Sequence, residues 1–145
     1  MSEQIRCFFI GHRDAPESVY PALFRTVEEH ITAHGVTEFV VGHYGNFDAM
    51  AARAVMDAKR QYPHVRLIRL LPYHPKPGDT ELPEGFDGSW YPSALDGVPK
   101  RVAILRANRC AVENAQYLIA YAHHPASNAR DLVEYARSRI PATEL

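Results

Sequence analysis

Short runs of apolar residues alternate along the chain with longer segments whose apolar residues recur at helical spacing. The runs are nearly continuous in apolar character instead of alternating, as in strands that are covered on both faces of a parallel sheet. They span residues 5–10, 38–41, 65–71 and 117–122. We therefore predict four buried strands.

The segments between these runs have the spacing of amphipathic helices. Residues 16–34 place Tyr20, Leu23, Val27 and Ile31 on one face, and Gly35 supplies a stop signal. Further helices are predicted over about 46–61, 99–114 and 128–139. Alternating strands and helices predict a wound α/β fold with three layers and a mostly parallel sheet of four to five strands. A fifth strand could only be short, beside Pro141, at an edge where proline is tolerated.

A segment rich in proline and glycine, residues 72–99, interrupts this alternation. Loops of this length in compact domains are usually lids, binding loops or disordered segments. Its aromatic residues, Tyr73, Phe86, Trp90 and Tyr91, argue against disorder. The sequence leaves open whether Trp90 and Tyr91 contact a ligand or pin the loop onto the domain.

Length and charge bound the remaining choices. A chain of 145 residues fits one domain, residues 1–145, and 16 Lys and Arg against 17 Asp and Glu give a net charge of −1. Without a basic field, nucleic acid is not an expected partner. Cys7 and Cys110 lie far apart in apolar segments, and no apolar run reaches membrane-spanning length. We expect a reduced, cytoplasmic protein with no membrane partner.

Distinctive residues follow the predicted strands, where wound sheets bind their ligands. They are Gly11-His12-Arg13-Asp14, then residues 42–48 (GHYGNFD), then residues 123–128 (HHPASN). Glycine at such turns lets backbone N–H groups approach an anion, and the next helix adds partial positive charge. Arg13 suits phosphate or carboxylate, although an ion pair with Asp14 or Asp48 is an alternative. Neither the dinucleotide fingerprint nor a P-loop is present.

Four of the eight histidines, His12, His43, His123 and His124, also follow strands. They could hydrogen-bond loop backbone, bind a ligand or perform acid–base chemistry, or hold a metal. Because no H-x-x-x-H or H-x-E pattern fixes two ligands on one element, we predict no metal site and no cofactor. Their position predicts a pocket whose charge depends on pH, and whose affinity for a ligand rises as the pH falls from about 8 to 6.

Several blocks of sequence together resemble the SLOG superfamily, a Rossmann-like group that includes the Smf/DprA DNA-processing proteins and the LOG nucleotide hydrolases. The blocks are Phe8–Pro16, Val41–Met50, Trp90–Pro92, Asn108-Arg109 with Glu113, and Ile119–His124. They cover nearly the whole chain in order and are most similar to the small stand-alone bacterial and phage branch.

The resemblance implies a Rossmann-like fold with a nucleotide pocket at the carboxyl edge of the sheet. Together with the strand-end pattern, it gives an expected ligand-binding set of Gly11, His12, Arg13, Gly42, His43, Gly45, Asn108, Arg109, His124, Ser127 and Asn128. Asp48 and Glu113 are the expected acids, for a ribose hydroxyl or an attacking water, and Tyr44, Trp90 and Tyr91 are expected to stack on the base. The function predicted is a nucleotide-binding or ligand-sensing module.

Two other functions remain open from the resemblance. One is a LOG-like phosphoribohydrolase that cleaves the N-glycosidic bond of a nucleoside monophosphate, and the other is DprA-like DNA binding. LOG enzymes carry a P-G-G-x-G-T-x-x-E stretch where this chain has Ser127-Asn128, so the glycines and the glutamate of that motif are absent. A homodimer is also compatible with the resemblance.

Overall fold

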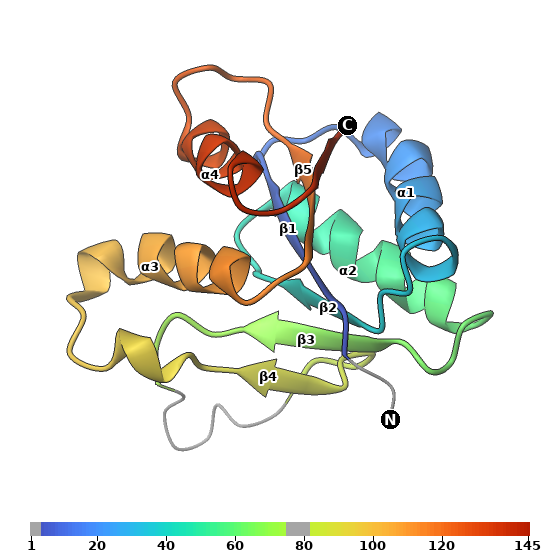
Figure 1. The fold of residues 1–145 in the computed structure, drawn as a ribbon, viewed down its shortest axis with the longest axis horizontal. Helices are drawn as coiled ribbons and strands as arrows, with labels where there is room; N and C mark the ends of the chain where they lie inside the picture. The colour runs from blue at the N-terminus through green and yellow to red at the C-terminus, as the bar shows by residue number, and fades with distance from the viewer. Residues whose placement is uncertain (1–3, 75–81) are drawn as a thin grey trace.

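The computed structural model describes residues 4–74 and 82–145, which form a six-stranded parallel sheet between two layers of helices (Figure 1). The strand order is β4-β3-β2-β1-β5-β6, and every neighbouring pair is parallel. The strands are β1 (Arg6–Gly11), β2 (Glu38–Val41), β3 (Arg66–Leu70), β4 (Gly88–Trp90), β5 (Tyr117–Tyr121) and β6 (Ala142–Glu144). The predicted wound α/β class is confirmed, with six strands in place of four to five.

The four predicted helices are confirmed. They are α1 (Tyr20–Thr32), α2 (Asn46–Lys59), α3 (Lys100–Glu113) and α4 (Asn128–Arg137), with short 3₁₀ helices η1 (Glu17–Val19) and η2 (Ser93–Leu95). Helices α1 and α2 pack on one face of the sheet, and α3 and α4 pack on the other. None of the described helices is long and apolar enough to cross a membrane.

The extra strand, β4, lies inside the segment that was predicted to be a loop. It pairs with Ile68–Leu70 of β3, and the Asp87 carboxylate accepts a hydrogen bond from the backbone N–H of Leu67 at 2.8 Å. Gly88-Ser89-Trp90 contains one apolar side chain, so no hydrophobic pattern predicts a strand at these residues. Its pairing with β3 makes it a strand. Residues 75–81 of the predicted loop lie outside the described residues. At the opposite edge, β6 is the short fifth strand that the sequence allowed.

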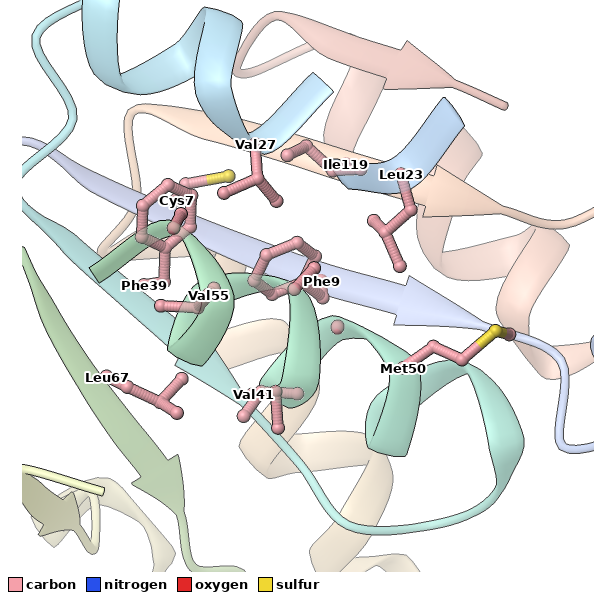
Figure 2. Close-up of a cluster of buried hydrophobic side chains, with 14 of the residues drawn as sticks. Cys7, Phe9, Leu23, Val27, Phe39, Val41, Met50, Val55, Leu67 and Ile119 are labelled. Carbon is pink, nitrogen blue, oxygen red and sulfur yellow. The ribbon is translucent and has the colours of Figure 1, made fainter. Parts of the chain in front are cut away.

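The face under α1 and α2 is filled by large side chains (Figure 2). The ring of Phe9 stacks on that of Phe39 with centroids 5.6 Å apart and meets Phe47 edge-on at 6.5 Å. Gly11 ends β1 beneath Phe47, where a Cβ would lie 2.3 Å from the ring. The glycine therefore makes room for a core aromatic at the edge of the sheet.

The topology changes direction between β1 and β5. The chain leaves β1 towards β2 through α1 on one face, and it leaves β5 towards β6 through α4 on the other. The loops that follow these two neighbouring strands therefore diverge and leave a crevice at their carboxyl ends. In wound sheets this switch point is the usual place for a ligand.

Candidate ligand-binding site

A cavity of about 250 Å³ lies at this switch point, bounded by three loops and α3. Nine of the residues predicted from the sequence line it: Gly11, His12, Arg13, Gly42, Tyr44, Asp48, Asn108, Ser127 and Asn128. They come from the ends of β1 and β2 and from the facing turns of α2, α3 and α4. The fold thus gathers most of the expected set at one place.

Asp48, in the first turn of α2, is the acid of this cavity. Its side chain is only 9% exposed, and its Oδ2 accepts a hydrogen bond from the backbone N–H of Tyr44 at 3.0 Å. Burial raises the pKa of Asp48 to about 6, against the opposing effects of that hydrogen bond and the charge of Arg13. A carboxylate that titrates near neutral pH can accept a hydrogen bond from a ligand hydroxyl, or it can take up a proton as a general base.

Arg13 is held in place through its backbone. Its carbonyl accepts a hydrogen bond from the N–H of Asn46 at 2.9 Å, which joins the loop after β1 to the start of α2. Gly45, at φ +126°, packs so closely that a Cβ would lie 2.5 Å from the Arg13 Cα. In the described part of the chain, the Arg13 guanidinium forms no ion pair with Asp14 or Asp48. Its side chain lines the cavity.

His12 joins the loops that follow β1 and β5. It is 7% exposed, and its Nε2 accepts a hydrogen bond from the backbone N–H of His124 at 3.1 Å, with the two rings 4.3 Å apart. This bond requires a neutral ring that carries its proton on Nδ1. Burial and the neighbouring His124 lower the pKa of His12, and burial and Arg69 lower that of His43. Both rings are therefore mostly neutral at pH 7, and each becomes protonated only at a pH below the ordinary histidine pKa of 6.5.

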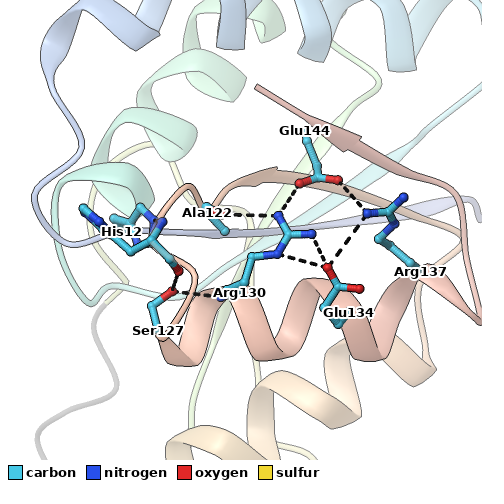
Figure 3. A network of polar contacts seen from close by, with 8 residues as sticks. His12, Ala122, Ser127, Arg130, Glu134, Arg137 and Glu144 are labelled. Atoms are coloured by element: carbon cyan, nitrogen blue, oxygen red, sulfur yellow. Dashed lines mark hydrogen bonds and ion pairs between the residues drawn. The ribbon is translucent and has the colours of Figure 1, made fainter.

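The start of α4 is fixed against the sheet by a polar network (Figure 3). Ser127 caps the helix, its Oγ accepting from the backbone N–H of Arg130 at 3.1 Å. The Arg130 guanidinium donates to the carbonyl of Ala122 at 3.3 Å and to Glu144 at 2.5 Å, and it also pairs with Glu134. The partial positive charge of the α4 N-terminus is thereby held beside the cavity.

Other predicted residues lie outside the cavity lining. Gly45 and His124 support lining residues, as described above, and His43 is exposed, with its ring 4.5 Å from that of Tyr44. Tyr91 donates to Asp96 at 2.9 Å and stacks on His74, and Trp90 packs against the core under α3 and α4. The structure does not bring Trp90 or Tyr91 to the cavity, and it places them where they hold the segment around β4.

Glu113 is separated from Asp48. It lies at the end of α3 and lines another cavity with Arg109, Cys110 and Tyr135. Its carboxylate accepts a hydrogen bond from the Tyr135 hydroxyl at 2.8 Å. The two predicted acids do not converge on one site.

Several lining residues were not predicted. They are apolar: Phe8, Phe9 and Ile10 from β1, Ile104 and Leu105 from α3, and Ala129 from α4. Arg69 of β3, which lines none of the three cavities, was not predicted either. Its Nε is buried without a hydrogen-bond partner among the described residues, and its charge acts on both His43 and Tyr44. In the described part of the chain, no group of three or more His, Cys, Asp or Glu could hold a metal ion.

Comparison with known proteins identifies the fold. No protein-family model and no curated protein matches the chain. Among solved structures, it is similar to the molybdenum cofactor binding protein of Rippkaea orientalis, with a TM-score of 0.64 and 14% identity over 99% of this chain and 77% of that one. It is also similar to the Moco carrier protein of Chlamydomonas reinhardtii, with a TM-score of 0.58 and 16% identity over 99% and 76%. The fold is therefore Rossmann-like α/β.

Proposed function

We propose that this protein binds a small phosphorylated ligand of nucleotide type at the switch point of the sheet, as a ligand-binding or sensing module of SLOG type. The observation that carries the proposal is the convergence of Arg13, buried Asp48 and the capped start of α4 on one cavity. The sequence blocks that resemble the SLOG superfamily support it. So does the fold shared with proteins whose names describe the binding of a molybdenum cofactor.

Each part of the cavity suits one part of such a ligand. The Arg13 guanidinium and the N-terminus of α4 supply positive charge and N–H donors for phosphate. The Asp48 carboxylate accepts hydrogen bonds from vicinal hydroxyls, as on ribose. Neutral His12 fixes the geometry of the loops on either side.

Hydrolysis is the second candidate function, and it rests on Asp48. A pKa of about 6 suits a general base that activates water. Hydrolysis of an N-glycosidic bond also needs assistance to the leaving base, and the other expected acid, Glu113, faces a different cavity. Binding without turnover is therefore the function we favour. Release of free adenine from AMP, measured chromatographically, would establish hydrolysis instead.

Calorimetric titration tests the proposal directly. The panel contains AMP, ADP-ribose, NAD, cyclic AMP and the molybdenum cofactor, titrated into the 145-residue chain near neutral pH. We expect saturable binding of at least one member and a higher melting temperature in its presence. Absence of heat from every member, with an unchanged melting temperature, would overturn the proposal.

A further inference from the structure

A second cavity continues from the first, along the groove between α3 and α4. Its volume is about 280 Å³, and it shares five lining residues with the first: Ile10, Leu105, Asn108, Asn128 and Ala129. Each cavity alone is smaller than the roughly 300 Å³ at which ordinary ligand pockets begin. Because the two share a wall, one ligand can fill both.

The two cavities differ in chemistry. The first holds Arg13, His12 and Asp48, whereas Val102 and Leu132 add apolar wall to the second beyond the shared residues. Charged side chains are present in the second cavity as well: Arg106, Arg109 and Asp131. Both cavities have more apolar than polar wall, and the apolar share is larger in the second.

Leu105 lies at the junction of the two cavities. Its side chain is 45% exposed, although it belongs to a helix that packs on the sheet. A single exposed leucine is unremarkable on its own. Here it forms part of both cavities, as do Asn108 and Asn128, whose side-chain amides can donate and accept hydrogen bonds in one plane.

From this arrangement we infer that the second cavity binds the ring system of the ligand whose phosphate lies in the first, with Leu105 as the specificity-determining contact. The inference rests on the proposed function and narrows it. An apolar wall takes the face of a heterocycle, and the two asparagine amides read its polar edge. The ligand class is thus a nucleoside phosphate or a similarly phosphorylated heterocycle, in preference to a sugar phosphate or free phosphate.

Paired ligands with and without a ring test this inference. AMP, GMP and ribose 5-phosphate are titrated calorimetrically into the wild type, Leu105→Gln and Leu82→Gln. Leu82→Gln is the matched control, because Leu82 is 38% exposed and lines neither cavity. In the wild type we expect one of the nucleotides to bind at least about tenfold more tightly than ribose 5-phosphate.

Leu105→Gln is expected to abolish most of that ratio because it weakens nucleotide binding much more than ribose 5-phosphate binding, and Leu82→Gln is expected to change neither affinity. Equal affinities for ribose 5-phosphate and both nucleotides in the wild type would overturn the inference but leave the proposed function standing. No binding by any of the three would overturn the inference, whereas the proposed function falls only if every member of its own panel also fails to bind. An equal loss in the two variants would also overturn it, because the effect would then not come from the groove.

The same apolar groove could instead be covered by a second copy of the chain. Light scattering of the wild type and Leu105→Gln separates this case. A wild-type dimer that dissociates on Leu105→Gln, with the ratio of nucleotide to ribose 5-phosphate affinity unchanged, would overturn the inference and make the groove an interface. A common oligomeric state for both proteins, together with the expected loss of the affinity ratio, supports it.

Discussion

The face of the sheet under α1 and α2 holds three interlocking aromatic rings, whereas α3 on the other face buries mostly small side chains. Under α1 and α2 the rings of Phe9, Phe39 and Phe47 interlock with no exposed area. Helix α3, on the other face, buries the small residues Ala103, Ala107 and Ala111, and the three cavities described above are all lined by α3. Large buried side chains supply stability on the first face, whereas the three cavities lie along the more exposed residues of α3. We therefore expect stability and binding to depend on largely different residues, although Phe9 also borders the first cavity.

The largest expected effect on stability comes from the face under α1 and α2, the closed face. Phe9→Ala removes a fully buried ring at the centre of the aromatic cluster and should lower the free energy of unfolding by about 3–5 kcal/mol. Leu105→Ala, on the open face, should cost less than about 1 kcal/mol because the side chain is already half in solvent. Urea unfolding followed by circular dichroism measures both. Comparable losses in the two variants would remove the distinction between the faces.

Burial of the Asp48 carboxylate in the candidate site should lower the stability of the fold. Its native pKa of about 6 lies above the value of 3.8 for an unperturbed carboxyl, so the native state keeps its proton longer than the unfolded state. Stability should therefore fall as pH rises from about 4 to 6 and stay lower above that range, by about 3 kcal/mol. Asp48→Asn should be more stable than the wild type by up to that amount at pH 8 and equally stable near pH 4. The measurement is urea unfolding at the two pH values. A difference between wild type and variant that is the same at both would show that burial does not shift this carboxyl.

At the carboxyl edge of the sheet, Arg13 should affect ligand binding without affecting folding. Arg13→Gln removes a charge-assisted contact to phosphate and should weaken the affinity for a nucleotide that binds the wild type by about 10- to 100-fold, with little change in melting temperature. Arg101→Gln is the control, because it removes the same charge from an exposed position on α3 that lines none of the three cavities. Equal effects of the two variants on affinity would show that general charge, and not the position of Arg13, governs binding.

The smallest expected effect concerns His12, which links the loops around the cavity. His12→Ala removes the acceptor for the His124 N–H and should cost about 1 kcal/mol at pH 7.5. Because burial lowers the pKa of His12, the unfolded state takes up a proton first as pH falls below 6.5, and the wild type loses this advantage. The stability difference between wild type and variant should therefore shrink towards pH 5. If it grew instead, the imidazolium would be the form that the fold prefers.

Most of the fold could be predicted from the sequence because the four buried strands are covered on both faces and their residues are correspondingly apolar. β4 could not, since Gly88-Ser89-Trp90 forms a strand through its pairing with β3. The polar half of the cavity was predictable because strand ends meet at one edge whatever the details of packing. Leu105 was not, because its place beside the cavity depends on how α3 docks. Trp90 was expected to stack on a base from its aromatic character and its place in a block that resembles the family, with packing against the domain as the alternative, and the fold packs it against the core.

The hydrogen bond between His124 and His12 joins residues 112 positions apart in sequence, and β1 lies between β2 and β5 in the sheet. During synthesis β1 to β3 leave the ribosome well before β5, so β1 has one open edge until residues 117–121 have been made. Pairing β1 with β5 brings together residues that are far apart in sequence, and contacts of this kind slow folding. The binding cavity is thus among the last parts of the molecule to form. A ligand that binds there would act on newly made chains by stabilising the finished sheet against reopening at the β1–β5 junction.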